Sequence, residues 1–126
     1  MKDSKTTVSK LKKMVDQFIK ERDWQQFHTA KNISTSIAIE TAELMEHFQW
    51  DDYQSDLSWS IQKKTEISDE IADIVVYAID FCNAFHIDLA SAIESKIKKN
   101  AKKYPVRKVK GKSHKYTYYQ QKQKAR

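Results

Sequence analysis

The chain has very few of the residues on which turns depend, with one glycine and one proline among its 126 residues. Tight turns, hairpins and bulged strands draw heavily on glycine and proline, so their scarcity argues against a β-rich fold. Long helices joined by few connections need neither residue. The length suffices for a single compact core. The composition therefore predicts an all-α protein.

The chain also lacks a second cysteine, an apolar leader and a long apolar run. The single Cys82 excludes a paired-cysteine zinc or redox site, fits a reducing compartment, and lies in an apolar stretch typical of core. The first ten residues contain no apolar stretch of the kind found in signal peptides. No run approaches the roughly 18 apolar residues of a membrane span. We therefore expect a cytoplasmic protein with no membrane partner.

Acidic residues are missing from the C-terminal end. After Glu94 there are none, whereas 13 of the 23 lysines and arginines lie there. Residues 1–94 carry 17 acids and 10 bases, a balance of −7. An acidic body with a basic arm indicates that something anionic is handled and that a cation is needed elsewhere. The alternative, an arm that only increases solubility, stays open on composition alone.

Apolar residues recur at steps of three and four in four segments, which predicts four helices. The predicted helices span Thr6–Glu21, Asn32–Trp50, Ile61–Phe85 and Leu89–Lys103. Asn32 or Ser34 is the candidate N-cap of the second helix and Asp88 that of the fourth, which Pro105 ends. Each helix has one apolar side. We therefore predict a four-helix bundle that is completed by oligomerisation.

The domain organisation follows from these segments. We predict a helical domain over residues 1–105 and a basic tail over residues 106–126 with little regular structure. A polar loop, residues 51–58, is expected between the second and third helices.

Two pairs of acids stand three residues apart on the second and third predicted helices, where such residues project from nearly the same side. One alternative is a solvated acidic face. It is disfavoured because no lysine or arginine lies between residues 66 and 85, and because both pairs border the apolar stripes. Carboxylates converging between helices would be strongly unfavourable without a cation. The pattern predicts a metal site made of Glu40, Glu43, Glu70 and Asp73.

Ligands that are all carboxylates favour a hard cation, Mg²⁺ or its substitute Mn²⁺. A di-iron site in a helical bundle needs Glu-x-x-His on two helices. Neither His47 nor His86 stands three residues after an acid, so iron is disfavoured. Mg²⁺ commonly binds through a few carboxylates plus substrate phosphates. The site therefore predicts a phosphorylated substrate.

Aromatic residues suited to a nucleobase lie close to these acids in the sequence. Trp24 and His28 precede the second predicted helix, Trp50 closes it, and Tyr77 shares the acidic face of the third. Aromatic faces can stack on a base. Most aromatic residues of small helical proteins belong to the core, however, so these residues alone leave the ligand role open.

Together these features resemble the MazG-like, all-α nucleotide pyrophosphohydrolases, and most closely their dCTP pyrophosphatase branch. The resemblance covers most of the chain, from about Leu11 to Thr117. Within the first acid pair the chain has Thr41 and Ala42, where the family often has a glycine. The matching strings are ERDWQQFH at 21–28, ETAELMEHFQW at 40–50, DEIADIVVY at 69–77, KIKKNAKKYP at 96–105 and KYT at 115–117.

The resemblance implies hydrolysis of a nucleoside triphosphate to monophosphate and pyrophosphate, as house-cleaning of the nucleotide pool. It implies a homodimer or homotetramer in which neighbouring subunits complete each site. It implies that Mg²⁺ binds to the four acids, that the base and sugar pocket is lined by Trp24, His28, Trp50 and Tyr77, and that the nucleotide also contacts Lys96 and Asn100.

A rival interpretation assigns the function to the basic arm. Its bases and interleaved tyrosines could bind nucleic acid or another partner, with salt-sensitive binding that survives metal removal. This interpretation leaves the acid pairs unexplained, so nucleic acid is the less favoured partner. A relative that binds a nucleotide without cleaving it is a second alternative, and the sequence leaves it open.

Overall fold

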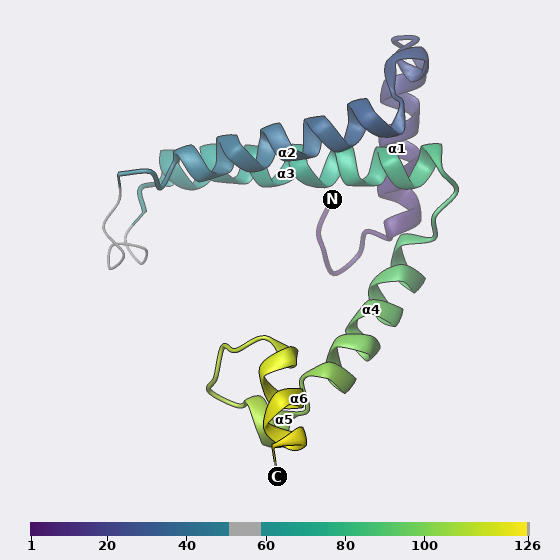
Figure 1. Ribbon diagram of the computed structural model, residues 1–126. Coiled ribbons are helices and arrows are strands. Elements are labelled where there is room, and N and C mark those ends of the chain that lie inside the picture. Colours follow the sequence, from purple (N-terminus) through teal and green to yellow (C-terminus); the bar gives the residue numbers. More distant parts are fainter. Residues whose placement is uncertain (51–58, 126) are drawn as a thin grey trace. The chain divides into compact units, whose positions relative to one another are not determined.

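The computed structural model describes residues 1–50 and 59–125, and within these ranges the chain is helical and contains no strand (Figure 1). The predicted all-α class is therefore confirmed. The chain divides into two compact units, residues 1–87 and a unit that begins at Asp88. The predicted loop over residues 51–58 lies outside the described residues. Completion of the bundle by oligomerisation stays a prediction.

The first unit contains three α-helices and one short 3₁₀ helix. Helices α2 and α3 lie side by side and antiparallel, and α1 packs on the C-terminal part of α3 (Figure 1). The three predicted helices are confirmed, although the second ends four residues earlier than expected. The elements are α1 (Val8–Lys20), η1 (Gln25–Phe27), α2 (Ala30–Glu46) and α3 (Ile61–Ala84).

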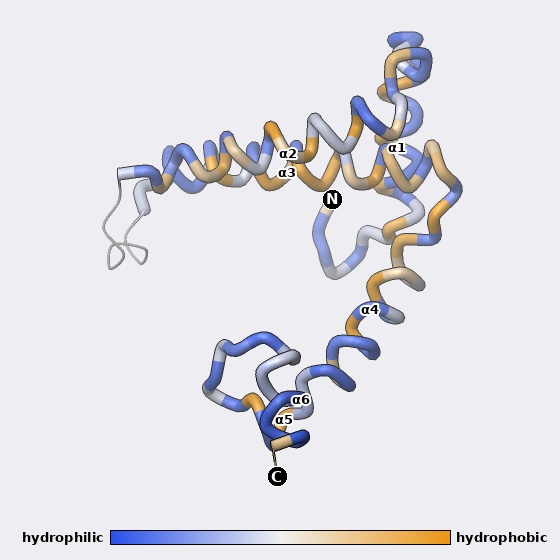
Figure 2. The backbone as a smooth tube through the Cα atoms, in the orientation of Figure 1, coloured by the Kyte–Doolittle hydropathy of each residue, from blue (hydrophilic) through white to orange (hydrophobic). Residues whose placement is uncertain are grey.

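A small apolar core holds these helices together. Figure 2 shows apolar residues along much of α3, the helix that both neighbours contact. Cys82 is buried and free, as its apolar neighbourhood predicts. Two hydrogen bonds fasten α1 to the end of α3 and to the residues after it, from Asn83 Nδ2 to the Lys12 carbonyl (2.9 Å) and from Lys12 Nζ to the Ile87 carbonyl (2.8 Å). The buried apolar residues are Val15, Ile19, Ile33, Ile67, Ile79 and Cys82.

Helix α2 begins earlier than expected because Thr29 caps it. The Thr29 hydroxyl accepts from the backbone N–H of Asn32 at 3.2 Å, so the predicted caps Asn32 and Ser34 are wrong. The Asn32 side chain instead donates to the carbonyl of Phe27 at 2.8 Å. This bond fastens the segment before α2 to the helix.

The chain leaves α1 through a left-handed residue, Asp23, with φ 53°. The Trp24 N–H donates to the Ile19 carbonyl (3.2 Å) and the Asp23 N–H to the Lys20 carbonyl (3.0 Å), the two bonds of a Schellman ending. An apolar contact commonly accompanies this ending. Here the Trp24 ring meets Phe18 edge-on, with centroids 5.8 Å apart. The turn therefore holds Trp24 against α1.

The second unit begins with α4 (Leu89–Lys103), whose bounds equal the predicted ones. Asp88 caps it as predicted, since its Oδ1 accepts from the Ser91 N–H at 2.8 Å. The expectation of a tail with little regular structure is wrong. Two further helices follow, α5 (Val106–Val109) and α6 (Tyr116–Lys124). The predicted domain boundary after residue 105 stays a prediction.

Aromatic contacts, and not an apolar stripe, hold the tail helices. The Tyr104 and Tyr116 rings meet edge-on at 6.2 Å, and the Lys103 ammonium lies 4.7 Å from the Tyr116 ring centroid. Gly111, with φ 73°, supplies the left-handed residue that the turn between α5 and α6 requires. Helices α5 and α6 have no apolar periodicity that could reveal them in the sequence. The prediction of an irregular tail failed for this reason.

Within the described ranges, no single helix is both long enough and apolar enough to cross a membrane. Helices α3 and α4 meet that requirement only when they are taken together across the break between them.

Candidate functional site

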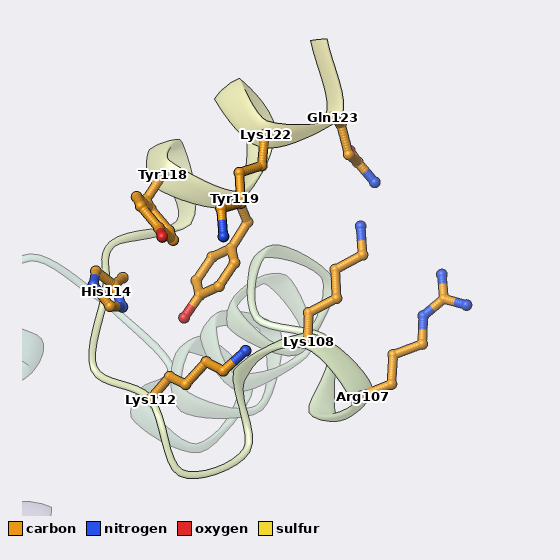
Figure 3. Close-up of a pocket in the computed structure, with 8 residues that line it drawn as sticks. All are labelled: Arg107, Lys108, Lys112, His114, Tyr118, Tyr119, Lys122 and Gln123. Atoms are coloured by element: carbon orange, nitrogen blue, oxygen red, sulfur yellow. The ribbon is translucent and has the colours of Figure 1, made fainter. Parts of the chain in front are cut away.

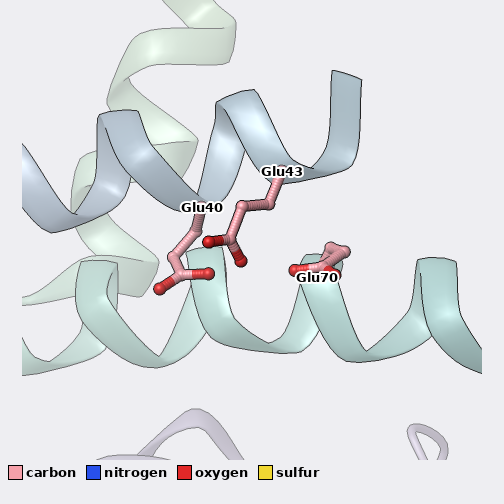
Figure 4. A group of neighbouring side chains, drawn as sticks. All are labelled: Glu40, Glu43 and Glu70. Carbon is pink, nitrogen blue, oxygen red and sulfur yellow. The ribbon is translucent and has the colours of Figure 1, made fainter. Parts of the chain in front are cut away.

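Three of the four predicted metal ligands converge between α2 and α3. Glu40 and Glu43, one turn apart on α2, point toward Glu70 on α3 (Figure 4). One carboxylate oxygen from each lies within 4.8 Å of the other two. The spacing of three residues places both α2 acids on the side that faces α3. A single cation could therefore accept an oxygen from each carboxylate.

The crowding of these acids changes the ionisation of Glu40. Burial raises the pKa of the Glu40 carboxyl above its ordinary value, as do the negative charges of Glu43 and Asp73, a hydrogen bond with Glu43 and the charge of Glu70. Asp73, the fourth predicted ligand, therefore lies close enough to act electrostatically on the cluster. An opposite charge favours the ionised form of a carboxyl. A bound cation would relieve this repulsion, so the residues fit a metal.

His47 also lies at the acid cluster, where the sequence analysis did not expect it. Its Nε2 is 3.5 Å from Oε1 of Glu70, and both side chains are about one-fifth exposed. With Glu43, Glu46 and Glu70 it lines a hollow of about 330 Å³. The sequence signal that could have found it is its position four residues after Glu43, one helical turn along the same face.

Asp73 borders a larger cavity of about 490 Å³ between α1 and α3. Three residues predicted to form the base pocket line it together, Trp24, His28 and Tyr77. The Trp24 and His28 rings lie 6.5 Å apart and are tilted by 35°. The remaining wall is largely apolar, as in most small-molecule pockets. Its apolar residues are Met14, Val15, Phe18, Ile19 and Val76.

Asp80 is a second residue whose place in the site the sequence analysis did not identify. It lines the same cavity at 5% exposure, and its Oδ2 lies 2.5 Å from Nδ1 of His28. Its position seven residues after Asp73, on the same face of α3, was the available signal.

Three predicted nucleotide contacts lie outside this cavity's lining. Trp50 stands in the turn after α2 with 89% of its surface exposed. Lys96 and Asn100 lie four residues apart on α4 and are exposed in the second unit. The binding roles of all three stay predictions.

The second unit contains a cavity of its own, of about 580 Å³ (Figure 3). The side chains of Lys108, Lys112 and Lys122 extend around Tyr119, and His114 stacks on Tyr118 with ring centroids 4.3 Å apart. No acidic residue is among those that line it. The lining residues are Arg107, Lys108, Lys112, His114, Tyr118, Tyr119, Lys122 and Gln123.

The fold and the site define a class of all-α proteins in which a cluster of acids that could hold a metal lies beside an aromatic cavity. The MazG-like family matches residues 35–118, a range that contains all four predicted metal ligands, and the chain belongs to this family. The family predicted from the sequence is thus confirmed.

Individual relatives agree with this assignment. The chain is 32% identical over 116 residues to dCTP pyrophosphatase 1 of Bos taurus, covering 90% of this chain and 69% of the relative. It is 31% identical over 113 residues to dCTP pyrophosphatase 1 of Homo sapiens, covering 88% and 66%. The chain thus spans about two thirds of the length of these relatives.

Among solved structures, a pyrophosphatase from Archaeoglobus fulgidus is similar with a TM-score of 0.69 and 35% sequence identity. The similarity covers 77% of this chain and 91% of that one. The helical arrangement is therefore shared over nearly the whole of the archaeal protein.

Proposed function

We propose that this chain is a Mg²⁺-dependent nucleoside triphosphate pyrophosphohydrolase that prefers dCTP-like pyrimidine nucleotides and removes unwanted nucleotides from the pool. One observation carries the proposal: Asp73 both acts on the acid cluster and lines the aromatic cavity. A single ligand with a metal-bound phosphate chain and an aromatic base would occupy both. The names of the similar proteins support this substrate class.

Glu40, Glu43, Glu70 and Asp73 would hold the metal, with Mn²⁺ as a substitute. When bound, Mg²⁺ supplies neutralisation of the phosphate charge and orientation of a water. The water oxygen would bond to the α-phosphorus as the bond from that phosphorus to the pyrophosphate oxygen breaks. One carboxylate of the cluster would accept the water's proton. The products are a nucleoside monophosphate and pyrophosphate, and no covalent nucleophile is required.

The aromatic cavity would orient the rest of the nucleotide. Trp24 and Tyr77 offer ring faces for the base, and the apolar wall excludes water around it. Lys96 and Asn100 would contact phosphate oxygens, since exposed lysine and amide donors pair well with them. Trp50 would contact the base from a neighbouring copy of the chain.

A second copy of the chain would complete the site. Several apolar residues of α2 and α3 are exposed in the single chain, including Ile39 (52%), Met45 (67%) and Ile71 (46%). Exposed apolar patches of this kind commonly mark association surfaces. We expect a homodimer or homotetramer by light scattering. If sites are shared between subunits, a mixture of Glu43→Gln and Lys96→Ala variants should recover part of the activity that each variant lacks.

The direct test is pyrophosphate release from a panel of ribo- and deoxyribonucleoside triphosphates, with Mg²⁺, with Mn²⁺ and with excess EDTA. We expect metal-dependent release, monophosphate as the co-product and the highest kcat/KM for a cytosine nucleotide. A folded oligomer that releases no pyrophosphate from any triphosphate would contradict the enzyme assignment. Binding of nucleotide without turnover would instead identify a relative that does not cleave.

The basic cavity of the second unit favours a second candidate function, binding of a nucleic acid strand. Four cationic side chains and two tyrosines surround it, and cations beside aromatic rings suit phosphates and stacked bases. We expect a labelled single-stranded oligonucleotide to bind in EDTA, more weakly as salt increases. The triple variant Lys108→Ala, Lys112→Ala, Lys122→Ala should lose this binding. Lys98→Ala, a base paired with Glu94 on α4, is the matched control. Equal binding by both variants would reject this function.

A further inference from the structure

Asp80 is the one charged side chain that is buried among the residues that the structure describes, with 5% of its surface exposed. Burying a carboxylate costs several kcal/mol unless it is paired. Its partner is His28, 52 residues away in the sequence, with 2.5 Å between Oδ2 and Nδ1. The pair connects α3 to the segment before α2. The position therefore carries a cost that a purely apolar contact would avoid.

A connection alone does not explain this choice of residues. Well-packed apolar residues often replace a buried ion pair without loss of stability. Asp80 and His28 instead lie where polar groups could contact a ligand, because both residues line the aromatic cavity. Polar groups placed in a mainly apolar pocket decide which ligand fits. The location thus indicates recognition of a ligand in addition to packing.

The arrangement along α3 indicates which part of the ligand the pair meets. Asp73, Tyr77 and Asp80 all line the cavity, and they follow each other along one face of α3. Asp80 stands seven residues beyond Asp73, about 10 Å further along the helix. With the phosphates at the acid cluster near Asp73, the base would extend past Tyr77 toward Asp80 and His28.

The contact fixes the chemistry that His28 offers. An ionised carboxylate only accepts hydrogen bonds, so Nδ1 of His28 must donate to it. In a neutral imidazole the other nitrogen, Nε2, then carries a lone pair and accepts. An exocyclic amino group can donate to this nitrogen. A carbonyl oxygen at the same place would face a second acceptor.

We propose that Asp80 is a positioning residue that fixes the tautomer of His28, so that Nε2 accepts from the exocyclic amine of the base and excludes bases with a carbonyl there. This inference rests on the proposed function and adds to it the residue that selects amino-bearing bases. Asp80 acts through His28 and does not contact the reacting atoms.

The kinetic test compares dCTP with dUTP, which differ at this amino or carbonyl position. Asp80→Asn offers an amide that can donate to Nδ1, which favours the opposite tautomer. We expect the ratio of kcat/KM for dCTP to that for dUTP to fall about tenfold, with most of the change in KM. Asp69→Asn is the matched control, because Asp69 is an exposed acid of the same helix that does not line the aromatic cavity. An unchanged ratio in folded Asp80→Asn protein would overturn the proposal.

A measurement that needs no turnover tests the tautomer directly. ¹⁵N NMR of the histidine side chains should show His28 with its proton on Nδ1 in the wild type and on Nε2 in Asp80→Asn, with the signal assigned from His28→Ala. A wild-type His28 protonated on Nε2 at the assay pH would overturn the inference.

Two further experiments distinguish failure of this inference from failure of the proposed function. If Asp80→Asn does not fold, His28→Ala removes the acceptor itself and should lower the dCTP to dUTP ratio by a similar factor; an unchanged ratio rejects the proposal. If no triphosphate is hydrolysed, the proposed function fails. The comparison of dCTP and dUTP affinities by calorimetry then decides the selectivity on its own.

Discussion

The acid cluster of the first unit and the basic cavity of the second carry side chains of opposite charge, and these side chains are arranged differently. The carboxylates of Glu40, Glu43 and Glu70 lie within 4.8 Å of one another on two long packed helices. The lysines of the second unit spread around a cavity of about 580 Å³, on two short helices and on the connection between them. Crowded charges repel strongly, whereas dispersed and solvated ones do not. The first arrangement suits a compact cation and the second an extended anion.

The net charge of a group of residues therefore does not by itself define a binding site. Burial, and then the acidic neighbours, raise the pKa of Glu40, so a cation bound among these carboxylates would relieve their repulsion. The basic cavity has no such crowding. Removing charge should therefore have large effects on chemistry in the first unit and small ones on stability in the second.

The largest effect is expected at the cluster. Glu43→Gln keeps the side-chain shape but removes one ligand charge, and kcat/KM should fall on the order of 10²–10³-fold. The stabilisation that saturating Mg²⁺ gives should also be lost. Steady-state kinetics and thermal melts with and without Mg²⁺ measure both. Asp69→Asn, an exposed acid of α3 outside the cluster, should keep wild-type values. Full activity of Glu43→Gln would show that the cluster is not the metal site.

A smaller effect is expected in the aromatic cavity. Trp24→Ala removes a stacking face worth about 1–3 kcal/mol, so KM should rise about tenfold or more while stabilisation by Mg²⁺ persists. Phe27→Ala is the control, because Phe27 is 59% exposed and outside the cavity lining. If the two variants had the same KM, Trp24 would have no part in binding the base.

The raised pKa of Glu40 predicts how the stability of the metal-free protein depends on pH. The folded chain holds this proton more tightly than the unfolded chain does. Its free energy of unfolding should therefore fall as pH rises from 4.5, the ordinary pKa of a glutamate, through the raised pKa of Glu40. Glu40→Gln lacks this loss and should be more stable than the wild type at neutral pH in EDTA. Parallel pH profiles of the melting temperature for the two proteins would refute this.

The smallest effect is expected in the tail. Gly111→Ala places a side chain at φ 73° in open space, so only backbone strain opposes it, at about 1 kcal/mol. Hydrogen exchange in α6 should accelerate, while exchange in α2 and α3 stays unchanged. Faster exchange throughout both units would mean that their stabilities are coupled.

The spacing of apolar and acidic residues along the sequence predicted most of the helices and the acid cluster of the site. Helix α4 has the predicted bounds and α3 differs by one residue, because apolar spacing is a local property. The acid pairs were visible for the same reason. The predicted start of α2 was wrong because Thr29, and not Asn32 or Ser34, is the N-cap of the helix. Helix α6 was missed because Tyr104, outside it, packs against Tyr116.

The sequence by itself determined the all-α class, the two acid pairs and the division between an acidic body and a basic arm. These depend on composition and on spacings within one helix. Only the tertiary structure decided that His47 meets Glu70, that Asp73 joins the cluster to the aromatic cavity, and that Asp80 holds His28. Such contacts arise when helices pack, and the two partners of the last pair are 52 residues apart. The periodicity of residues within one helix does not predict a contact between residues so far apart in the sequence.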